Sequence, residues 1–233
     1  VRMPAHGVRA VFIQQKGEVN AMGKVLLING SPNEYGCTYT ALHEVEGALH
    51  RNGIKTELLW LGRKPVAGCI ACNTCARTGR CVFGTEPFDD KVNGVLEVLD
   101  GIDAIVVGSP VYYAAASGQI TSFLNRLFYA GGRRMAGKLG AAVVSCRRGG
   151  AASAFDQLNK YFTICNMPVV SSQYWNQVHG NTPEQVLQDA EGLQMMRTLG
   201  ENMAWLLRNI EAGKQVGVPA PQYEPKVATN FIR

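Results

Sequence analysis

The sequence predicts an α/β protein built on one doubly wound, five-stranded parallel sheet with helices on both faces. Apolar runs alternate with segments of helical periodicity from Lys24 to Asn209, which is the βαβ pattern of a covered parallel sheet. Three of the runs are almost continuously apolar, as expected for strands buried on both sides. The chain has 233 residues, 46% of them hydrophobic, which suffices for one good core and is too short for two ordinary domains with a linker.

Five strands and five helices are expected in strict alternation. The strands occupy residues 24–30, 54–61, 103–109, 138–145 and 168–175. The helices occupy residues 38–52, 87–99, 117–130, 150–165 and 183–212. Ligands of doubly wound sheets bind at the carboxyl ends of the strands. The loops after the first, third and fourth strands are therefore where we expect the chemistry.

The last helix has the clearest boundaries. Thr182 is the expected N-cap, Pro183 fits the first helical position, and Gly213 is expected to end the helix. The tail from Lys214 contains three prolines and predicts an extended arm that lies on this subunit or on a partner. The chain then divides into an N-terminal extension (1–21), the α/β domain (22–212) and a C-terminal arm (213–233).

Charge and hydropathy exclude several classes of protein. The formal net charge is +5 and the basic residues are scattered, so no nucleic-acid-binding face is expected. No run of eighteen apolar residues is present, so no membrane helix is expected. Met22 is the expected natural start, and residues 1–21 lack the apolar core of a signal peptide. We therefore expect a cytoplasmic protein, whose seven cysteines are thiols or metal ligands and not disulfides.

The first loop, residues 30–40, predicts an anion site. It has neither the G-x-G-x-x-G pattern nor the G-K-[ST] ending of an ATP-binding loop, but it offers polar groups from Ser31, Asn33 and Thr38 directly before a helix. Free N–H groups at a helix N-terminus bind anions. The missing lysine indicates a phosphate that is held and not transferred. The alternative is a capped helix with a proline turn.

The second and third loops predict a planar ligand. Two adjacent tyrosines, Tyr112 and Tyr113, follow the third strand and are costly to expose. A flat aromatic ligand would cover them; packing under the loop or at a dimer contact is the alternative. The third loop, residues 145–153, contains Gly149 and Gly150, which permit close approach of the backbone. Cys146 fits a small buried residue better than a nucleophile, because no His or carboxylate stands near it in sequence.

Together the three loops resemble the flavin-binding loops of the NAD(P)H-dependent FMN reductase family, over residues 24–210. The resemblance implies a flavodoxin-like fold with strand order 2-1-3-4-5 and non-covalently bound FMN. It implies a phosphate site formed by Ser31, Asn33, Thr38 and Tyr39. It implies that the isoalloxazine ring lies against Pro110, Val111, Tyr112 and Tyr113, and that its other edge is lined by Cys146, Arg147, Gly149 and Gly150. Asn33 replaces the family's usual basic residue, which changes the expected phosphate contacts.

Four cysteines form a separate candidate site between the second strand and the next helix. They follow the spacing C-x2-C-x2-C-x5-C and are Cys69, Cys72, Cys75 and Cys81. Close-set thiolates of this kind hold iron–sulfur clusters, and the spacing resembles that of iron–sulfur flavoproteins, in which four cysteines hold a [4Fe-4S] cluster. Free or redox-active thiols and zinc are the alternatives. Arg77 and Arg80 are expected to favour thiolates.

Three functions follow from these sites. The first is an FMN-dependent oxidoreductase that takes a hydride from NADH or NADPH and reduces a quinone-like, nitro, azo or metal-ion acceptor, with flavin N5 as the reactive centre and no protein catalyst nominated. The second is an iron–sulfur flavoprotein that carries single electrons between FMN and ferredoxin-like partners. The third is a flavin-binding redox sensor without turnover. The resemblance also implies a homodimer or homotetramer.

Overall fold

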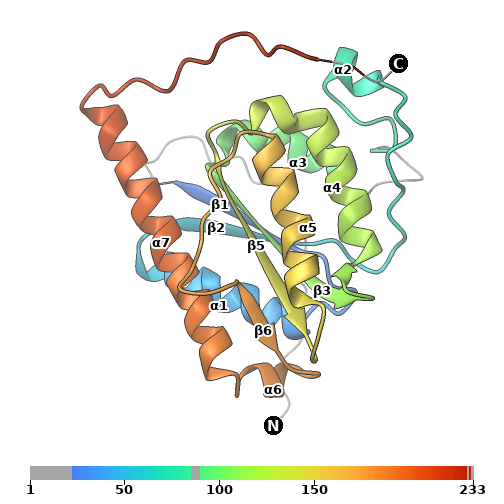
Figure 1. Ribbon diagram of the computed structural model, residues 1–233, viewed down its shortest axis with the longest axis vertical. Coiled ribbons are helices and arrows are strands. Elements are labelled where there is room, and N and C mark those ends of the chain that lie inside the picture. The colour runs from blue at the N-terminus through green and yellow to red at the C-terminus, as the bar shows by residue number, and fades with distance from the viewer. Residues whose placement is uncertain (1–22, 85–89, 230, 232–233) are drawn as a thin grey trace.

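The apolar runs form one parallel sheet in the order β2-β1-β3-β5-β6 in the computed structural model, which describes residues 23–84, 90–229 and 231 (Figure 1). Its strands are β1 (Lys24–Asn29), β2 (Lys55–Trp60), β3 (Ala104–Tyr112), β5 (Leu139–Cys146) and β6 (Gln177–His179). A short strand, β4 (Ala115–Ala116), pairs antiparallel with the end of β3. Apart from β4, this is the predicted order 2-1-3-4-5.

Helices cover both faces of the sheet. The longer ones are α1 (Cys37–Arg51), α3 (Val92–Val98), α4 (Gly118–Gly131), α5 (Ala151–Ile164) and α7 (Ala190–Gln215). The shorter ones are α2 (Thr74–Thr78), η1 (Leu99–Gly101), η2 (Gly132–Arg134) and α6 (Pro183–Val186). In Figure 1, α1 and α7 lie on one side of the sheet, and α4 and α5 on the other. In the described part of the chain, none of the helices combines the length and apolar character that crossing a membrane requires.

The sheet divides the core into two because successive side chains of a strand point to opposite faces. On β1, Val25 and Leu27 pack with α1 and α7, whereas Leu26 and Ile28 pack with α3, α4 and α5. Each fully buried Leu or Ile contributes about 1.5–3 kcal/mol to stability. The two cores therefore hold the carboxyl ends of β1, β3 and β5 in a fixed relation.

The predicted fifth strand was wrong in position. Of residues 168–175, only Val169 pairs with the sheet, in a bridge to Gly140, and the chain then leaves the sheet. Tyr174 and Trp175 are half-exposed in this excursion. The chain returns as β6, whose His179 lies beside Cys146 of β5. The β-branched and aromatic composition of the segment suggested a strand, but composition does not determine which residues pair with β5 at the edge of the sheet.

The last predicted helix is interrupted and extended. Thr182 caps α6 by accepting a hydrogen bond from the Gln185 N–H, as predicted, but the chain breaks after α6 and Asp189 caps the separate helix α7. Gly213 does not end α7, which continues to Gln215; the left-handed Gly217 (φ +80°) follows its end. The predicted extension, residues 1–21, lies outside the described residues, as does part of the predicted helix 87–99.

Candidate functional site

The three predicted loops meet at one edge of the sheet. The first and second loops are joined by the Ser117 hydroxyl, which donates to the Gly30 carbonyl (2.9 Å), and by the Gly30 N–H, which donates to the Gly108 carbonyl (2.9 Å). The first and third are joined where the hydroxyls of Thr38 and Ser145 lie 2.8 Å apart. Hydrogen bonds thus fix the three loops relative to one another.

A buried asparagine at the end of β1 shapes the first loop. Asn29 accepts a hydrogen bond from the Ser31 N–H (3.0 Å) and donates to the Glu34 carbonyl (3.0 Å). The Ser31 hydroxyl oxygen accepts from the Asn33 N–H (3.1 Å), and the Trp60 indole donates to the Ser31 carbonyl (2.8 Å). With the loop held in this way, α1 begins at Cys37, and its N-cap residue Gly36 provides no side-chain cap. The first N–H groups of α1 therefore have no partner within the helix and are available to a ligand at this edge of the sheet.

The four predicted phosphate-site residues differ in how far they are buried. Asn33 is exposed, while Ser31 and Thr38 are buried. Tyr39 is partly buried and stacks on His43, with ring centroids 5.5 Å apart. The Thr38 hydroxyl faces Ser145, whereas its backbone N–H lies at the uncapped start of α1, where a ligand would meet it.

Replacing Thr38 by valine should therefore lower the free energy of unfolding and have little effect on the affinity for the cofactor. The change removes the hydrogen bond to Ser145 and leaves that buried hydroxyl without its partner, so we expect the free energy of unfolding to fall by about 1–3 kcal/mol. Urea denaturation measures the loss. In a double-mutant cycle, T38V with S145A should cost less than the two single changes summed. Additive costs would contradict a direct contact between the hydroxyls.

The two tyrosines of the second loop lie on a tight hairpin. β3 ends at Tyr112, which pairs with Ala115 of β4, so the turn consists of Tyr113 and Ala114. Both have positive φ angles, 51° and 59°, as the type I′ turn requires; Asn-Gly is the pair that normally supplies them. Each non-glycine residue in this region costs about 1–2 kcal/mol. The turn presents a half-exposed Tyr112 and a fully exposed Tyr113 at the edge where the loops meet.

The third loop packs against the hairpin at Gly150. Gly150 has a φ of +86°, and a Cβ there would lie 2.7 Å from Ala114 Cα. Arg147 and Gly149 are exposed, and a Cβ at Gly149 would meet open space. Cys146 is buried, and burial raises the pKa of its thiol, which keeps it neutral. Its burial agrees with the prediction of a small buried residue at this position.

The four cysteines of the second candidate site line one cavity, together with Arg126 and Tyr129 of α4. All seven cysteines of the chain are free thiols. Burial raises the pKa of Cys75, and the three neighbouring thiols raise it further, so the four sulfurs lie within electrostatic reach of one another. Hydrogen bonds of Thr74 lower the pKa of Cys72, which is exposed.

The donor set suits a metal centre, although its sulfurs are not drawn together. Among the described residues, no three Cys, His, Asp or Glu side chains are already arranged as ligands. An iron–sulfur cluster therefore requires the exposed Cys69 and Cys72 to turn toward Cys75 and Cys81. Four thiols around one cavity nevertheless fit such a centre, because exposed side chains change rotamer readily.

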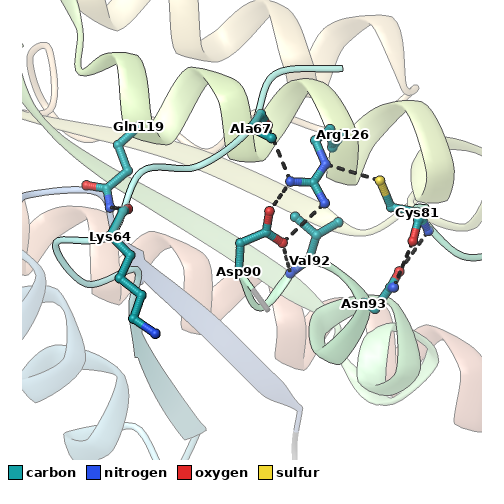
Figure 2. Close-up of polar contacts among 8 residues, drawn as sticks. All are labelled: Lys64, Ala67, Cys81, Asp90, Val92, Asn93, Gln119 and Arg126. Carbon is teal, nitrogen blue, oxygen red and sulfur yellow. Dashed lines mark hydrogen bonds and ion pairs between the residues drawn. The ribbon is translucent and has the colours of Figure 1, made fainter. Parts of the chain in front are cut away.

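A buried arginine connects the cysteine loop to the domain (Figure 2). Arg126 of α4 donates from Nε to Cys81 Sγ (3.1 Å) and forms an ion pair with Asp90. Burial lowers the pKa of Arg126, but its hydrogen bonds to Asp90 and Cys81 outweigh burial and raise it overall. Asn93 of α3 holds the Cys81 backbone, accepting from its N–H (2.8 Å) and donating to its carbonyl (2.9 Å).

The sequence did not reveal these supporting residues. Arg126 falls three positions after Phe123, at the border of the apolar face of α4, where an arginine normally reaches water. The expected role of Arg80 is not observed at the sulfurs, since its guanidinium pairs with Glu97. A polar residue ending an apolar strand was the only available signal for Asn29.

A family model described as NADPH-dependent FMN reductase matches residues 23–182. The chain belongs to this family. An iron–sulfur flavoprotein of Methanocaldococcus jannaschii is 32% identical, with the match covering 81% of this chain and 99% of that protein. The family of this chain therefore includes iron–sulfur flavoproteins, and the resemblance drawn from the loops and the cysteine spacing is confirmed.

Two solved structures share the fold at low identity. An NAD(P)H:quinone oxidoreductase from Methanothermobacter marburgensis has a TM-score of 0.57 at 16% identity, covering 78% of this chain and 96% of that chain. RosB, solved with bound 8-demethyl-8-formylriboflavin 5′-phosphate, has a TM-score of 0.62 at 14% identity, covering 90% and 96%. These likenesses support the flavodoxin-like fold.

Proposed function

We propose that the protein is an iron–sulfur flavoprotein that binds FMN at the carboxyl edge of the sheet, holds a [4Fe-4S] cluster in the cysteine loop, and passes electrons between them. One observation carries this proposal. The four cysteines line a single cavity in a chain that aligns with 99% of an iron–sulfur flavoprotein. Family membership alone supports the flavin; the clustered thiols favour the additional metal centre.

The first two loops provide the groups that FMN needs. The phosphate lies at the uncapped start of α1, where Ser31, Asn33 and the backbone of Thr38 and Tyr39 offer donors. In a sheet of this order the ligand site falls between β1 and β3, where the strand order reverses. The hairpin carries residues Pro110 to Tyr113 near that point, where the exposed tyrosine rings would lie against one face of a flat ligand.

The third loop closes the other side of the flavin. Cys146 contributes a small neutral thiol, Arg147 an exposed cation, and Gly149 and Gly150 a backbone without side chains. Bound FMN supplies hydride and single-electron transfer through its ring. An arginine near the ring favours the negative charge that reduction adds.

The cysteine loop provides the second redox site. Its four thiolates would hold the cluster, whose chemistry is the exchange of single electrons. Half of the donor set, Cys69 and Cys72, is exposed, so this side of the protein is open to a ferredoxin-like electron-transfer partner. If the protein binds flavin but shows neither electron transfer nor iron, its function is that of a redox sensor without turnover.

A second candidate function is an NAD(P)H oxidoreductase with a small acceptor of the quinone-like, nitro, azo or metal-ion type. The family's description as NADPH-dependent favours this function. The exposed Tyr112 and Tyr113 rings give a nicotinamide or a planar acceptor a surface to stack on, next to the flavin. Under both proposals the protein is a homodimer or homotetramer and acts in the cytoplasm.

Purification without air tests the proposal directly. We expect a brown protein with about one FMN, four iron and four acid-labile sulfide per chain, since four thiolates are the ligands of such a cluster. Adding NADH or NADPH and following the flavin absorbance separates the two candidates, because only the oxidoreductase is bleached rapidly and turns over with a quinone. A yellow protein without iron would reject the cluster, and a colourless protein that binds no FMN would reject the flavin site.

A further inference from the structure

One helix supports both proposed redox sites. The cap residue of α4, Ser117, binds the first flavin loop through the Gly30 carbonyl. Nine residues later, about 14 Å along the helix axis at about 1.5 Å per residue, Arg126 reaches the cysteine loop. One turn further, the Tyr129 hydroxyl donates to Asn73 Oδ1 (2.7 Å) beside the cysteines. The loop is therefore fixed to the same rigid element that follows the tyrosine hairpin.

Arg126 uses every side of its guanidinium. Besides Cys81 Sγ, it donates to the Ala67 carbonyl (3.3 Å) and, from Nη2, to Asp90 Oδ1 (3.2 Å). Its Cζ lies 5.3 Å from the centroid of the Phe83 ring. The side chain is fully buried and Asp90 is nearly so. Figure 2 shows the arginine between the carboxylate on one side and the sulfur on the other.

Loop attachment alone does not explain this arrangement. Buried ion pairs contribute little net stability, because desolvation of both charges offsets their attraction, and apolar residues of similar volume often do as well. The arginine adds an N–H aimed at a sulfur and a positive charge close to it. Hydrogen bonds to the sulfurs and nearby charge are the terms by which proteins set the potentials of iron–sulfur sites.

We propose that Arg126 positions Cys81 and raises the reduction potential of the centre that the four cysteines hold, with Asp90 acting in the opposite direction. This inference rests on the proposed cluster. Reduction adds one negative charge to the centre and its sulfurs. A donated N–H and a buried cation stabilise that charge, whereas a buried carboxylate opposes it.

Opposite shifts in two variants test the inference. Arg126→Gln removes the cation, and Asp90→Asn removes the anion of the same ion pair. EPR-monitored redox titration of the FMN-loaded protein, purified without air, should show the equilibrium constant for reduction at least tenfold lower in R126Q, which is about 59 mV for one electron. D90N should raise the potential. The FMN potential, titrated in the same sample, should change less than that of the cysteine centre.

Two further variants serve as controls. Arg134→Gln breaks an exposed ion pair with Asp100 (Arg134 Nε to Oδ1, 3.0 Å) in η2, which follows α4, and should leave the potential unchanged. Arg126→Lys keeps the charge but serves Asp90 and Cys81 only one at a time, so its potential should fall by less than that of R126Q. It replaces R126Q if that variant does not fold, as judged by circular dichroism.

The outcomes separate the inference from the proposed function. If R126Q and D90N shift the potential in the same direction, the pair acts through loop structure and the role of Arg126 is overturned. The same holds if both Arg126 variants match R134Q, and in either case the cluster stands. Wild-type protein without iron and sulfide would overturn the cluster, and the inference with it.

Discussion

Replacing Cys72 by serine is expected to remove iron and acid-labile sulfide from the protein and to leave its FMN content unchanged. Iron should fall at least tenfold, because a serine hydroxyl is a far weaker ligand for iron than a thiolate. Cys72 is exposed, so in protein without the cluster the change should cost the fold no more than about 0.5 kcal/mol. Iron, sulfide and flavin analysis of protein purified without air measures all three quantities.

The matched control is Cys165→Ser, at the end of α5 and outside the cysteine loop. It removes a thiol without touching the proposed ligand set, so its iron content should equal that of the wild type. Wild-type iron in C72S would exclude Cys72 as a ligand. Loss of FMN together with iron would show that the two sites are not independent, contrary to their attachment at opposite ends of α4.

The fold was predictable because its determinants are local. The nearly continuous apolar runs of β1, β3 and β5 could be read one strand at a time, and burial on both faces follows from helices on both sides. The edge strand was not predictable in this way. Residues 168–175 have strand-like composition, but which residues pair depends on β5, and the structure selects Gln177–His179 instead.

The same distinction between local patterns and long-range contacts applies to the sites. Spacing along the chain identified the four cysteines, and loop composition identified Tyr112, Tyr113 and Gly150. The contacts that hold these residues are long-range: Arg126 meets Cys81 across 45 positions, and Thr38 meets Ser145 across 107. A single sequence contains no local pattern for such pairs. The sequence therefore predicted the candidate site residues but not the residues that position them.

Replacing Gly150 by alanine should damage the flavin site through the hairpin above it. The new Cβ would lie 2.7 Å from Ala114 Cα and 2.9 Å from Ala114 Cβ, and a backbone atom cannot rotate away. Gly150 also has a φ of +86°, a conformation that alanine adopts at a cost of about 1–3 kcal/mol. We expect the free energy of unfolding to fall by that amount and the Kd for FMN to rise at least tenfold, measured by thermal denaturation and by fluorescence titration of the FMN-free protein.

The adjacent glycine provides the control. Gly149→Ala adds the same methyl group where no atom lies within 4 Å and where φ lies outside the positive range, so stability should remain that of the wild type. If G150A binds FMN as the wild type does, the tyrosine hairpin is no part of the flavin site. If G149A weakens FMN binding at unchanged stability, the ring approaches the third loop directly at Gly149. Parallel titration of the two variants therefore separates support of the hairpin from contact with the cofactor.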